Sequence, residues 1–159
     1  MHPSNRFGKR RFPRAAIEST AKVSVGHDNY QATVKQISEG GLRLESEREL
    51  PNVQLALVFD LPGFGEQRVV SEICWQREAP RGYGLRFKDV QQGTVSSIAS
   101  YVTKMKHAYA ELQLSLALGK PRALFASLLR EVKLDHLTDE LHLRVTVDRA
   151  MEQLRTPNT

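Results

Sequence analysis

Gln36-Ile37-Ser38-Glu39-Gly40-Gly41 lies between two runs in which apolar and polar residues alternate, at positions 30–37 and 41–45. Alternation with a period of two is typical of a strand that buries one face. Two glycines after a short polar pair favour a tight turn, because glycine adopts backbone conformations that other residues avoid. The stretch therefore predicts a turn that joins two antiparallel strands.

Similar patterns occur on both sides of this turn. Alternating or strongly apolar runs, separated by glycine and proline signals, lie at residues 21–25, 53–59, 68–76 and 83–87. Six short strands with turns between them predict a small antiparallel barrel or sandwich. A barrel has the advantage that its closure leaves no exposed strand edge.

A basic segment, Lys9-Arg10-Arg11-Phe12-Pro13-Arg14, precedes these strands. Residues 1–35 contain seven Lys and Arg against two acidic residues, and this excess equals the formal net charge of +5 of the whole chain. The planar guanidinium of Arg donates two parallel hydrogen bonds to a phosphate or to the edge of guanine. Pro13 disfavours a helix in this segment. Because of its arginines, we predict an arm that closes over an anionic ligand and is ordered by it. The alternative is a solvated tail without a ligand.

Arg10-x-x-x-Arg14, together with Ser38-x-x-Gly41 at the end of an early strand, resembles the two signatures of the PilZ domain family. The family comprises bacterial receptors for cyclic di-GMP, built on a six-stranded β-barrel with a helix after it. Tyr83-Gly84-Leu85-Arg86-Phe87 is similar to the last barrel strand of the family. Gln36 departs from the pattern, which usually has Asp or Asn at that position. The resemblance covers roughly residues 6–106.

The resemblance implies a mainly β fold with α-helices: a six-stranded antiparallel PilZ-like β-barrel followed by a C-terminal helical extension. The domains are then a flexible basic ligand-binding arm at residues 1–15, the barrel with the start of the following helix at 16–106, and the helical extension at 107–159. The implied ligand is cyclic di-GMP. The implied ligand-binding residues are Arg10, Arg11, Arg14, Gln36, Ser38, Gly40, Gly41 and Arg43.

These residues have distinct expected roles. The arginines of the arm grip guanine edges and phosphates, the glycines keep the turn open for the ligand, and Gln36 with Ser38 contacts a guanine. A carboxylate at position 36 would bind two guanine N–H groups as a charge-assisted pair, and the amide of Gln36 lacks that charge. We expect this loss to weaken the guanine contact by ~1–3 kcal/mol.

Three functions are consistent with the sequence. The first is a cyclic di-GMP receptor or adaptor that relays the second-messenger level to an unidentified effector protein through ordering of its arm. The second is a degenerate PilZ-like adaptor that does not bind the nucleotide, for which Gln36 is the argument. The third is a single-stranded nucleic-acid-binding barrel, which needs aromatics on a basic strand face. Nucleic acid ranks last because the excess charge is confined to the arm and the first strands.

A helical pattern follows the last strand. Apolar residues at three- and four-residue steps form an a/d seam of three heptads within residues 94–118. Thr94 is the expected N-cap, and Gly119-Lys120-Pro121 ends the helix. The seam packs either on the barrel and the following helices or on a second copy, which would make a homo-oligomer. Residues 122–134 predict a second helix, and the acidic start Thr138-Asp139-Glu140 favours a third helix over a strand.

Signals for catalysis, metal binding and membrane insertion are missing from the sequence. The five histidines show no metal-ligand spacing, and no phosphate loop or paired-carboxylate motif occurs, so we expect neither an enzyme nor a metal or cofactor site. No run approaches the ~20 apolar residues of a membrane span. The single cysteine, Cys74, lies in an apolar run and is expected to be a packed core thiol in a reducing, bacterial cytoplasm.

Overall fold

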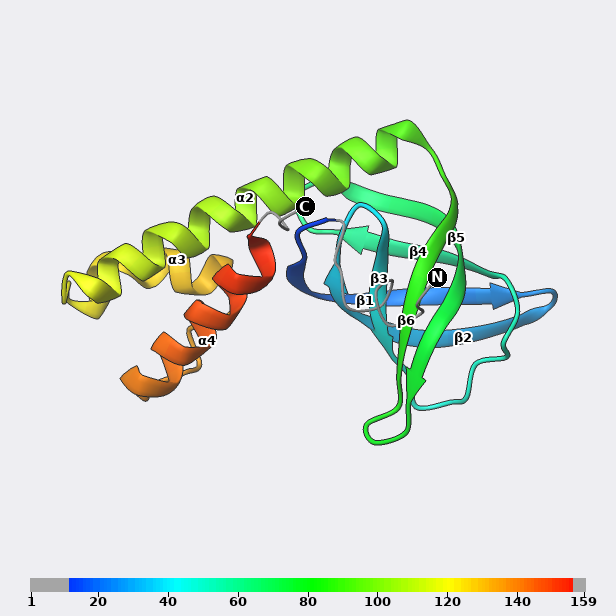
Figure 1. The fold of residues 1–159 in the computed structure, drawn as a ribbon, viewed down its shortest axis with the longest axis horizontal. Coiled ribbons are helices and arrows are strands. Elements are labelled where there is room, and N and C mark those ends of the chain that lie inside the picture. The colour runs from blue at the N-terminus through cyan, green and yellow to red at the C-terminus, as the bar shows by residue number, and fades with distance from the viewer. Residues whose placement is uncertain (1–11, 156–159) are drawn as a thin grey trace, which may run out of the picture.

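The computed structural model describes residues 12–155 and contains a closed, six-stranded antiparallel β-barrel (Figure 1). The strands are β1 (Ala15–Val25), β2 (Asp28–Ile37), β3 (Gly41–Glu45), β4 (Leu55–Leu61), β5 (Gly65–Arg77) and β6 (Gly82–Val90). Their order around the barrel is β1-β2-β3-β6-β5-β4, and the pairing of β1 with β4 closes the sheet. The predicted fold class is confirmed.

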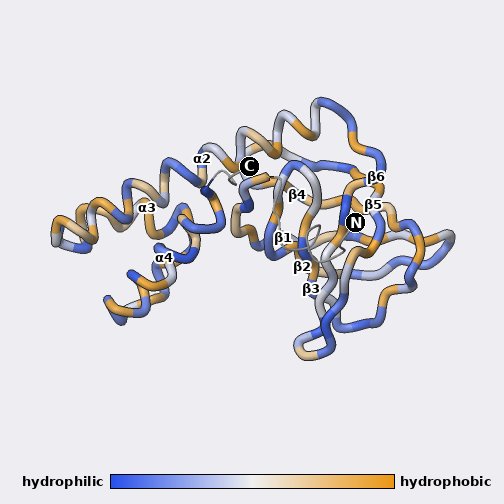
Figure 2. The backbone as a smooth tube through the Cα atoms, in the orientation of Figure 1, coloured by the Kyte–Doolittle hydropathy of each residue, from blue (hydrophilic) through white to orange (hydrophobic). Residues whose placement is uncertain are grey.

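The barrel forms because each strand has one apolar face. Residues of β1 alternate between buried and exposed from Ala15 to Val23, and β4 alternates in nearly the same way from Leu55 to Leu61. Figure 2 shows the corresponding change between hydrophobic and hydrophilic residues along the strands. Burying a large apolar side chain contributes about 1.5–3 kcal/mol. The inward side chains of the six strands therefore hold the barrel together from within.

A β-bulge in β5 changes which side chains face outward. The register of β5 with β6 shifts between Ile73 and Trp75. A bulge adds one residue to one strand and so interrupts the alternation of inward and outward side chains. Cys74 is exposed as a result, and the prediction of a packed core thiol is wrong. Its neighbour Trp75 is 42% exposed.

Helices follow the barrel. They are α2 (Gln92–Ala117), the 3-10 helix η1 (Arg122–Phe125), α3 (Ala126–Glu131) and α4 (Glu140–Leu154). Thr94 is not the N-cap of α2, because the helix begins earlier, with Gln91 as its cap, and Thr94 is buried inside the first turn. The predicted end is confirmed, and Gly119 takes the positive φ of +66° that ends many helices. The last segment is a helix, as predicted, and the Asp139 carboxylate accepts a hydrogen bond from the Leu141 amide at its start.

The second half of α2 forms a helical lobe with η1, α3 and α4 (Figure 1). The first half of α2 contacts β1, and the helix then extends beyond the barrel over α3 and α4. Ile98, Met105 and Leu112 of the heptad seam are buried by these contacts. The seam is thus covered within the chain. A homo-oligomer through residues 94–118 stays a prediction, and it would use the outer face of α2.

Residues 12–155 were compared with the requirements of a membrane-spanning helix and of a metal site. No helix in this part of the chain is long and apolar enough to cross a membrane. In the same part, no three His, Cys, Asp or Glu side chains form a group that could hold a metal ion.

Candidate functional site

The end of the basic arm and the serine of the turn lie side by side at one end of the barrel. β1 and β2 pair in antiparallel register, with Ala15 opposite Ile37. Arg14 and Ser38 each stand one residue beyond this pair, so the register brings them next to each other. Two segments that are distant in sequence therefore form one surface.

The turn keeps its shape through Ser38 and through close packing. The Ser38 Oγ accepts a hydrogen bond from the Gly40 amide and donates one to the Gly41 carbonyl, both at 3.3 Å. The ring of Phe12 lies over the turn, since a Cβ on Gly40 would come within 3.0 Å of it. A Cβ on Gly41 would lie 2.1 Å from the Leu85 carbonyl oxygen in β6. The close approach of β3 and β6 therefore requires Gly41, and its role in keeping the turn open for a ligand stays a prediction.

Gln36 and Arg43 extend this surface along the strands. They stand opposite each other in the pairing of β2 with β3, and both are half-buried. The Nε of Arg43 is buried and has no hydrogen-bond partner among the described residues. A buried donor without a partner costs about 1–3 kcal/mol.

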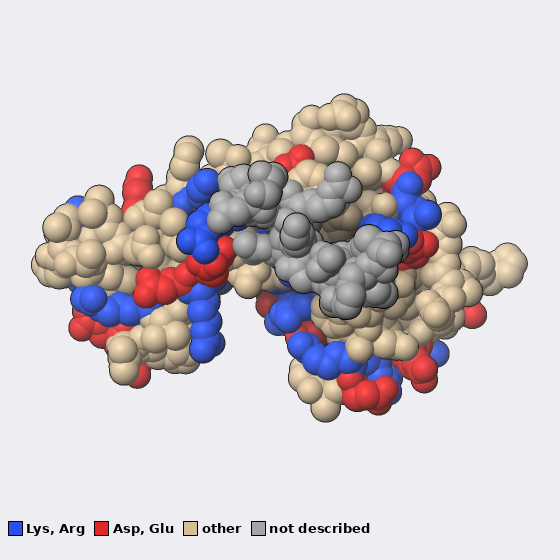
Figure 3. All heavy atoms as spheres, in the orientation of Figure 1, with Lys and Arg blue, Asp and Glu red and all other residues tan. Residues whose placement is uncertain are grey.

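A groove of about 370 Å³ lies between the barrel and the helical lobe, and Arg14 and Gln36 line it. Ligand sites occur preferentially at such junctions between two packed units. Figure 3 shows Lys and Arg side chains on both sides of the notch between the lobe and the barrel. The side of the groove formed by helices and their connections includes Tyr101, Lys104, Lys133, Arg149 and Gln153.

Two tyrosines of α2 also line this groove. The hydroxyl of Tyr101 donates a hydrogen bond to the Ala16 carbonyl at 2.9 Å, which ties α2 to the start of β1. Burial raises the pKa of Tyr101 and raises the pKa of Tyr109 to about 12. Both phenols therefore remain neutral near pH 7 and add no negative charge to the groove.

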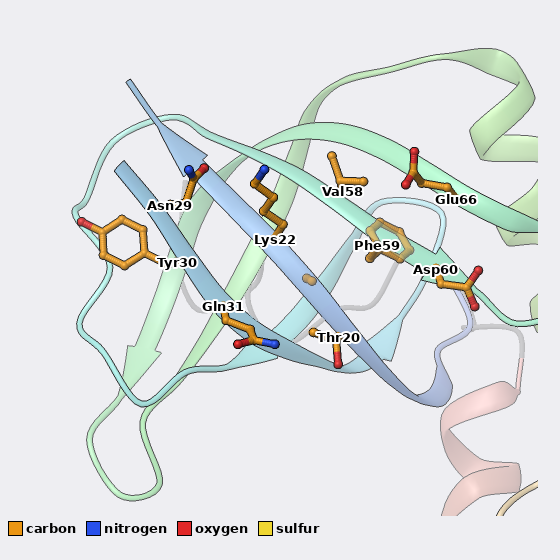
Figure 4. A pocket seen from close by; sticks show the side chains of 10 residues that line it. Thr20, Lys22, Asn29, Tyr30, Gln31, Val58, Phe59, Asp60 and Glu66 are labelled. Carbon is orange, nitrogen blue, oxygen red and sulfur yellow. The ribbon is translucent and has the colours of Figure 1, made fainter. Parts of the chain in front are cut away.

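A larger hollow, of about 620 Å³, lies on the outer face of the barrel over β1, β2 and β4 (Figure 4). None of the predicted site residues lines it. Its lining residues combine Lys22 with Asp60 and Glu66, so it offers no excess of positive charge to an anionic ligand. The groove at Arg14 is the better candidate site.

Comparison with protein families identifies the family of this chain. The family model for the PilZ domain matches residues 8–104, more than half of the chain. The chain belongs to the PilZ family. A search of curated proteins found no match.

Three solved structures share the PilZ fold of this chain. YcgR from Escherichia coli in complex with c-di-GMP has a TM-score of 0.55 and 12% identity, over 64% of this chain and 48% of that chain. The Bacillus subtilis inhibitor of motility, MotI/DgrA, has a TM-score of 0.52 and 15% identity, over 58% and 48%. MrkH of K. pneumonia, a c-di-GMP-dependent transcription regulatory factor, has a TM-score of 0.52 and 18% identity, over 61% and 51%. The chain spans about half the length of these proteins.

The PilZ barrel gathers the described members of the predicted site at one end. These are Arg14, Gln36, Ser38, Gly40, Gly41 and Arg43. Arg10 and Arg11 lie outside the described residues. A further arginine, Arg86, stands opposite Gly41 in the register of β3 and β6 but already forms an ion pair with Glu72. The hydrogen bond from Arg86 lowers the pKa of the Glu72 carboxyl, so this pair stays charged.

Sequence reasoning missed Trp75 as a member of this surface of the PilZ barrel. Trp75 stands opposite Gly84, and Gly84 stands opposite Arg43 on the next strand. A Cβ on Gly84 would lie 2.1 Å from the Trp75 Nε1, so the indole lies over the glycine. An exposed aromatic ring can stack on a nucleobase. The signal in the sequence was the sole tryptophan, but the bulge conceals its alignment with Gly84.

Proposed function

We propose that the protein is a receptor for cyclic di-GMP that relays the level of this second messenger to a partner protein. The observation that carries the proposal is the meeting of Arg14 and Phe12 of the arm with Ser38 and Gly40 of the turn at one end of a PilZ barrel. Arg14 of the arm signature and Ser38 of the turn signature thus contribute to a single surface. The likeness of the fold to E. coli YcgR in complex with c-di-GMP supports the choice of ligand.

Charge and backbone shape hold the ligand in this proposal. The Arg14 guanidinium donates parallel hydrogen bonds to a phosphate or to the O6/N7 edge of a guanine. Gln36 and Ser38 contact a guanine from the strand and the turn, and Arg43, half-buried opposite Gln36, adds a guanidinium. Arg10 and Arg11, outside the described residues, add positive charge to the arm at residues 1–15.

Ligand binding orders the arm, and the helical lobe receives the change. The Arg14 amide donates a hydrogen bond of 2.8 Å to the carbonyl of Gln153, near the end of α4. A change in the arm therefore acts directly on that helix. A ligand shifts a conformational equilibrium by its difference in affinity for the two states. In our proposal the receptor is cytoplasmic and has no catalytic activity. Its two states differ in how the arm contacts α4, and an unidentified effector protein binds one state in preference to the other.

Gln36 favours one alternative function. The amide cannot supply the charge that a carboxylate would bring to two guanine N–H groups. A protein in which this loss is decisive would be a PilZ-like adaptor that binds protein partners and no nucleotide. Its barrel and lobe would keep the same fold.

Titration calorimetry of the purified protein with cyclic di-GMP tests the proposal. GTP and a short single-stranded oligonucleotide serve as controls. We expect micromolar or tighter binding that is selective for the cyclic dinucleotide. A folded protein that binds none of the three would favour the adaptor, whereas binding of the oligonucleotide alone would favour a nucleic-acid-binding barrel.

Two arginine variants locate the site. Arg14→Ala should abolish binding and leave the barrel folded, because it removes the guanidinium and keeps the backbone amide that bonds to Gln153. Arg68→Ala is the matched control, since Arg68 is exposed on β5 and pairs only with Glu66 among the described residues, at 3.3 Å. It should bind as tightly as the wild type. Retained affinity in Arg14→Ala, with an unchanged circular dichroism spectrum, would refute the proposed site.

A further inference from the structure

The helical lobe is attached directly to the residues of the proposed site. The Arg14 amide bonds to the Gln153 carbonyl at 2.8 Å, and the Tyr101 hydroxyl bonds to the Ala16 carbonyl at 2.9 Å. Figure 1 shows the start of β1 beside the C-terminal end of α4, and the two elements are in contact. Side chains on this face of α4 therefore lie close to whatever Arg14 binds.

Arg149 lies on the face of α4 that borders the groove. Residues four apart on a helix are neighbours on one face, with Cβ atoms about 5–6 Å apart. Arg149 therefore stands one turn before Gln153, the residue that bonds to Arg14. Arg14, Gln36 and Arg149 all line the groove of about 370 Å³. One guanidinium comes from the barrel wall and the other from the lobe wall.

Positive charge predominates in this groove. Lys104 of α2 and Lys133 after α3 line it together with the two arginines. Glu18 and Glu131 are its acidic lining residues. Glu18 is already paired with a lysine of β2 at 2.7 Å. Within residues 12–155, neither Lys104 nor Lys133 takes part in an ion pair. No carboxylate of the described residues neutralises these two lysines through an ion pair.

Lys133 occupies a backbone position at which glycine is usual. Its φ is 60°, in the left-handed region. The Leu134 amide bonds to the Leu129 carbonyl at 2.8 Å and the Lys133 amide bonds to the Arg130 carbonyl at 3.2 Å, which is the Schellman pattern at the end of a helix. Glycine takes this position without strain, whereas a lysine does not. Such strain is concentrated at functional sites, and here the strained residue lines the groove.

We propose that Arg149 and Lys133 bind a phosphate of the cyclic dinucleotide that Arg14 holds from the opposite side, so that the helical lobe forms one wall of the ligand site. This inference rests on the proposed function. A cyclic dinucleotide carries two phosphodiesters and presents negative charge in two directions. The groove matches it with cations on two walls. The bound ligand then bridges the arm and α4, which gives the relay a physical link.

Calorimetry with cyclic di-GMP on the full chain tests the inference with Arg149→Ala, Lys133→Gly and the control Arg130→Ala. Arg130 is exposed on α3 and lies outside the groove lining. Its loss changes the net charge by the same amount as the loss of Arg149 or Lys133. We expect the first two variants to bind about 5- to 30-fold more weakly and the control to bind as the wild type. Arg149→Lys should recover part of the loss, because the ammonium keeps the charge but not the planar fork.

Lys133→Gly separates binding from stability. Glycine relieves the strained backbone, so the thermal midpoint should rise by about 2–4 °C, while the affinity falls. Opposite changes in one variant exclude partial unfolding as the cause of the weaker binding. A lower midpoint together with weaker binding would mean that the lysine supports the fold and would overturn its role at the ligand.

The remaining outcomes keep the two proposals apart. A folded wild-type protein without affinity for cyclic di-GMP would refute the proposed function itself. Wild-type binding with full affinity in Arg149→Ala and Lys133→Gly would leave the receptor function standing and remove the lobe from the site. An equal loss in Arg130→Ala would indicate general attraction between charges and would also overturn the inference.

Discussion

Gly41→Ala should destabilise the barrel by about 2–4 kcal/mol, with or without a ligand. The added methyl group would lie 2.1 Å from the Leu85 carbonyl oxygen, whereas a carbon and an oxygen in contact stand about 3.3–3.6 Å apart. β3 and β6 must therefore separate by about 1 Å from a normal spacing of about 4.8 Å. Overpacking of this kind costs about 1–3 kcal/mol. The movement also weakens the bonds from the Phe87 amide to the Gly40 carbonyl (3.0 Å) and from the Ser38 amide to the Gly41 carbonyl (2.9 Å), each worth about 0.5–1.5 kcal/mol.

Urea unfolding followed by circular dichroism measures this effect. With a denaturant slope of about 2 kcal/mol per molar, the midpoint should fall by about 1–2 M. Gly93→Ala is the matched control, because Gly93 is exposed in the first turn of α2 and an added Cβ meets nothing within 4 Å. The same methyl group should raise the midpoint there, since alanine favours a helix over glycine by up to about 1 kcal/mol. A Gly41→Ala midpoint equal to that of the wild type would refute the close approach of the strands as the reason for this glycine.

Two further predictions concern the groove. Gln36→Asp introduces the carboxylate charge that pairs with guanine. It should tighten cyclic di-GMP binding by about 5- to 150-fold, the equivalent of ~1–3 kcal/mol. Calorimetry that shows equal or weaker affinity would argue against a guanine contact at this position. Burial raises the pKa of Tyr109 to about 12, from about 10 in the unfolded chain. Burial of the neutral phenol therefore contributes its full stability below pH 10, and this stability is lost as the pH rises towards 12. Urea midpoints between pH 9 and 12 should fall less steeply for Tyr109→Phe than for the wild type, and parallel curves would contradict this assignment.

The strands were predictable because each carries a local pattern. β3 was predicted with its observed bounds, Gly41–Glu45, and the other strands with shifts of a few residues at their ends. β1 begins earlier than predicted, at Ala15, and so brings Arg14 to the barrel. The segment before residue 21 carries the same alternation of buried and exposed residues, but alanine and serine at inward positions make it weak in hydrophobicity. Pairing with β2 determines this end of the strand.

Features that depend on distant partners were not predictable. The bulge in β5 exposes Cys74 and Trp75, and its position depends on the pairing with β6. The groove likewise joins Arg14 to Arg149, residues at opposite ends of the chain. Sequence alone gives no register between α4 and β1. For this reason the helical extension was assigned to packing or to partners, and its cations were not connected with the ligand.

The serine and the glycines of the turn carry less information about the ligand than their place in the family signature implies. Ser38 bonds to its own turn, Gly40 accommodates the ring of Phe12, and Gly41 accommodates the Leu85 carbonyl. A chain that had lost its nucleotide would need these residues to the same extent, because the barrel depends on them. Their presence therefore cannot separate the receptor from the adaptor. That distinction depends on side chains that the fold does not require, above all Gln36 and the cations of the groove, and it is at these positions that binding has to be measured.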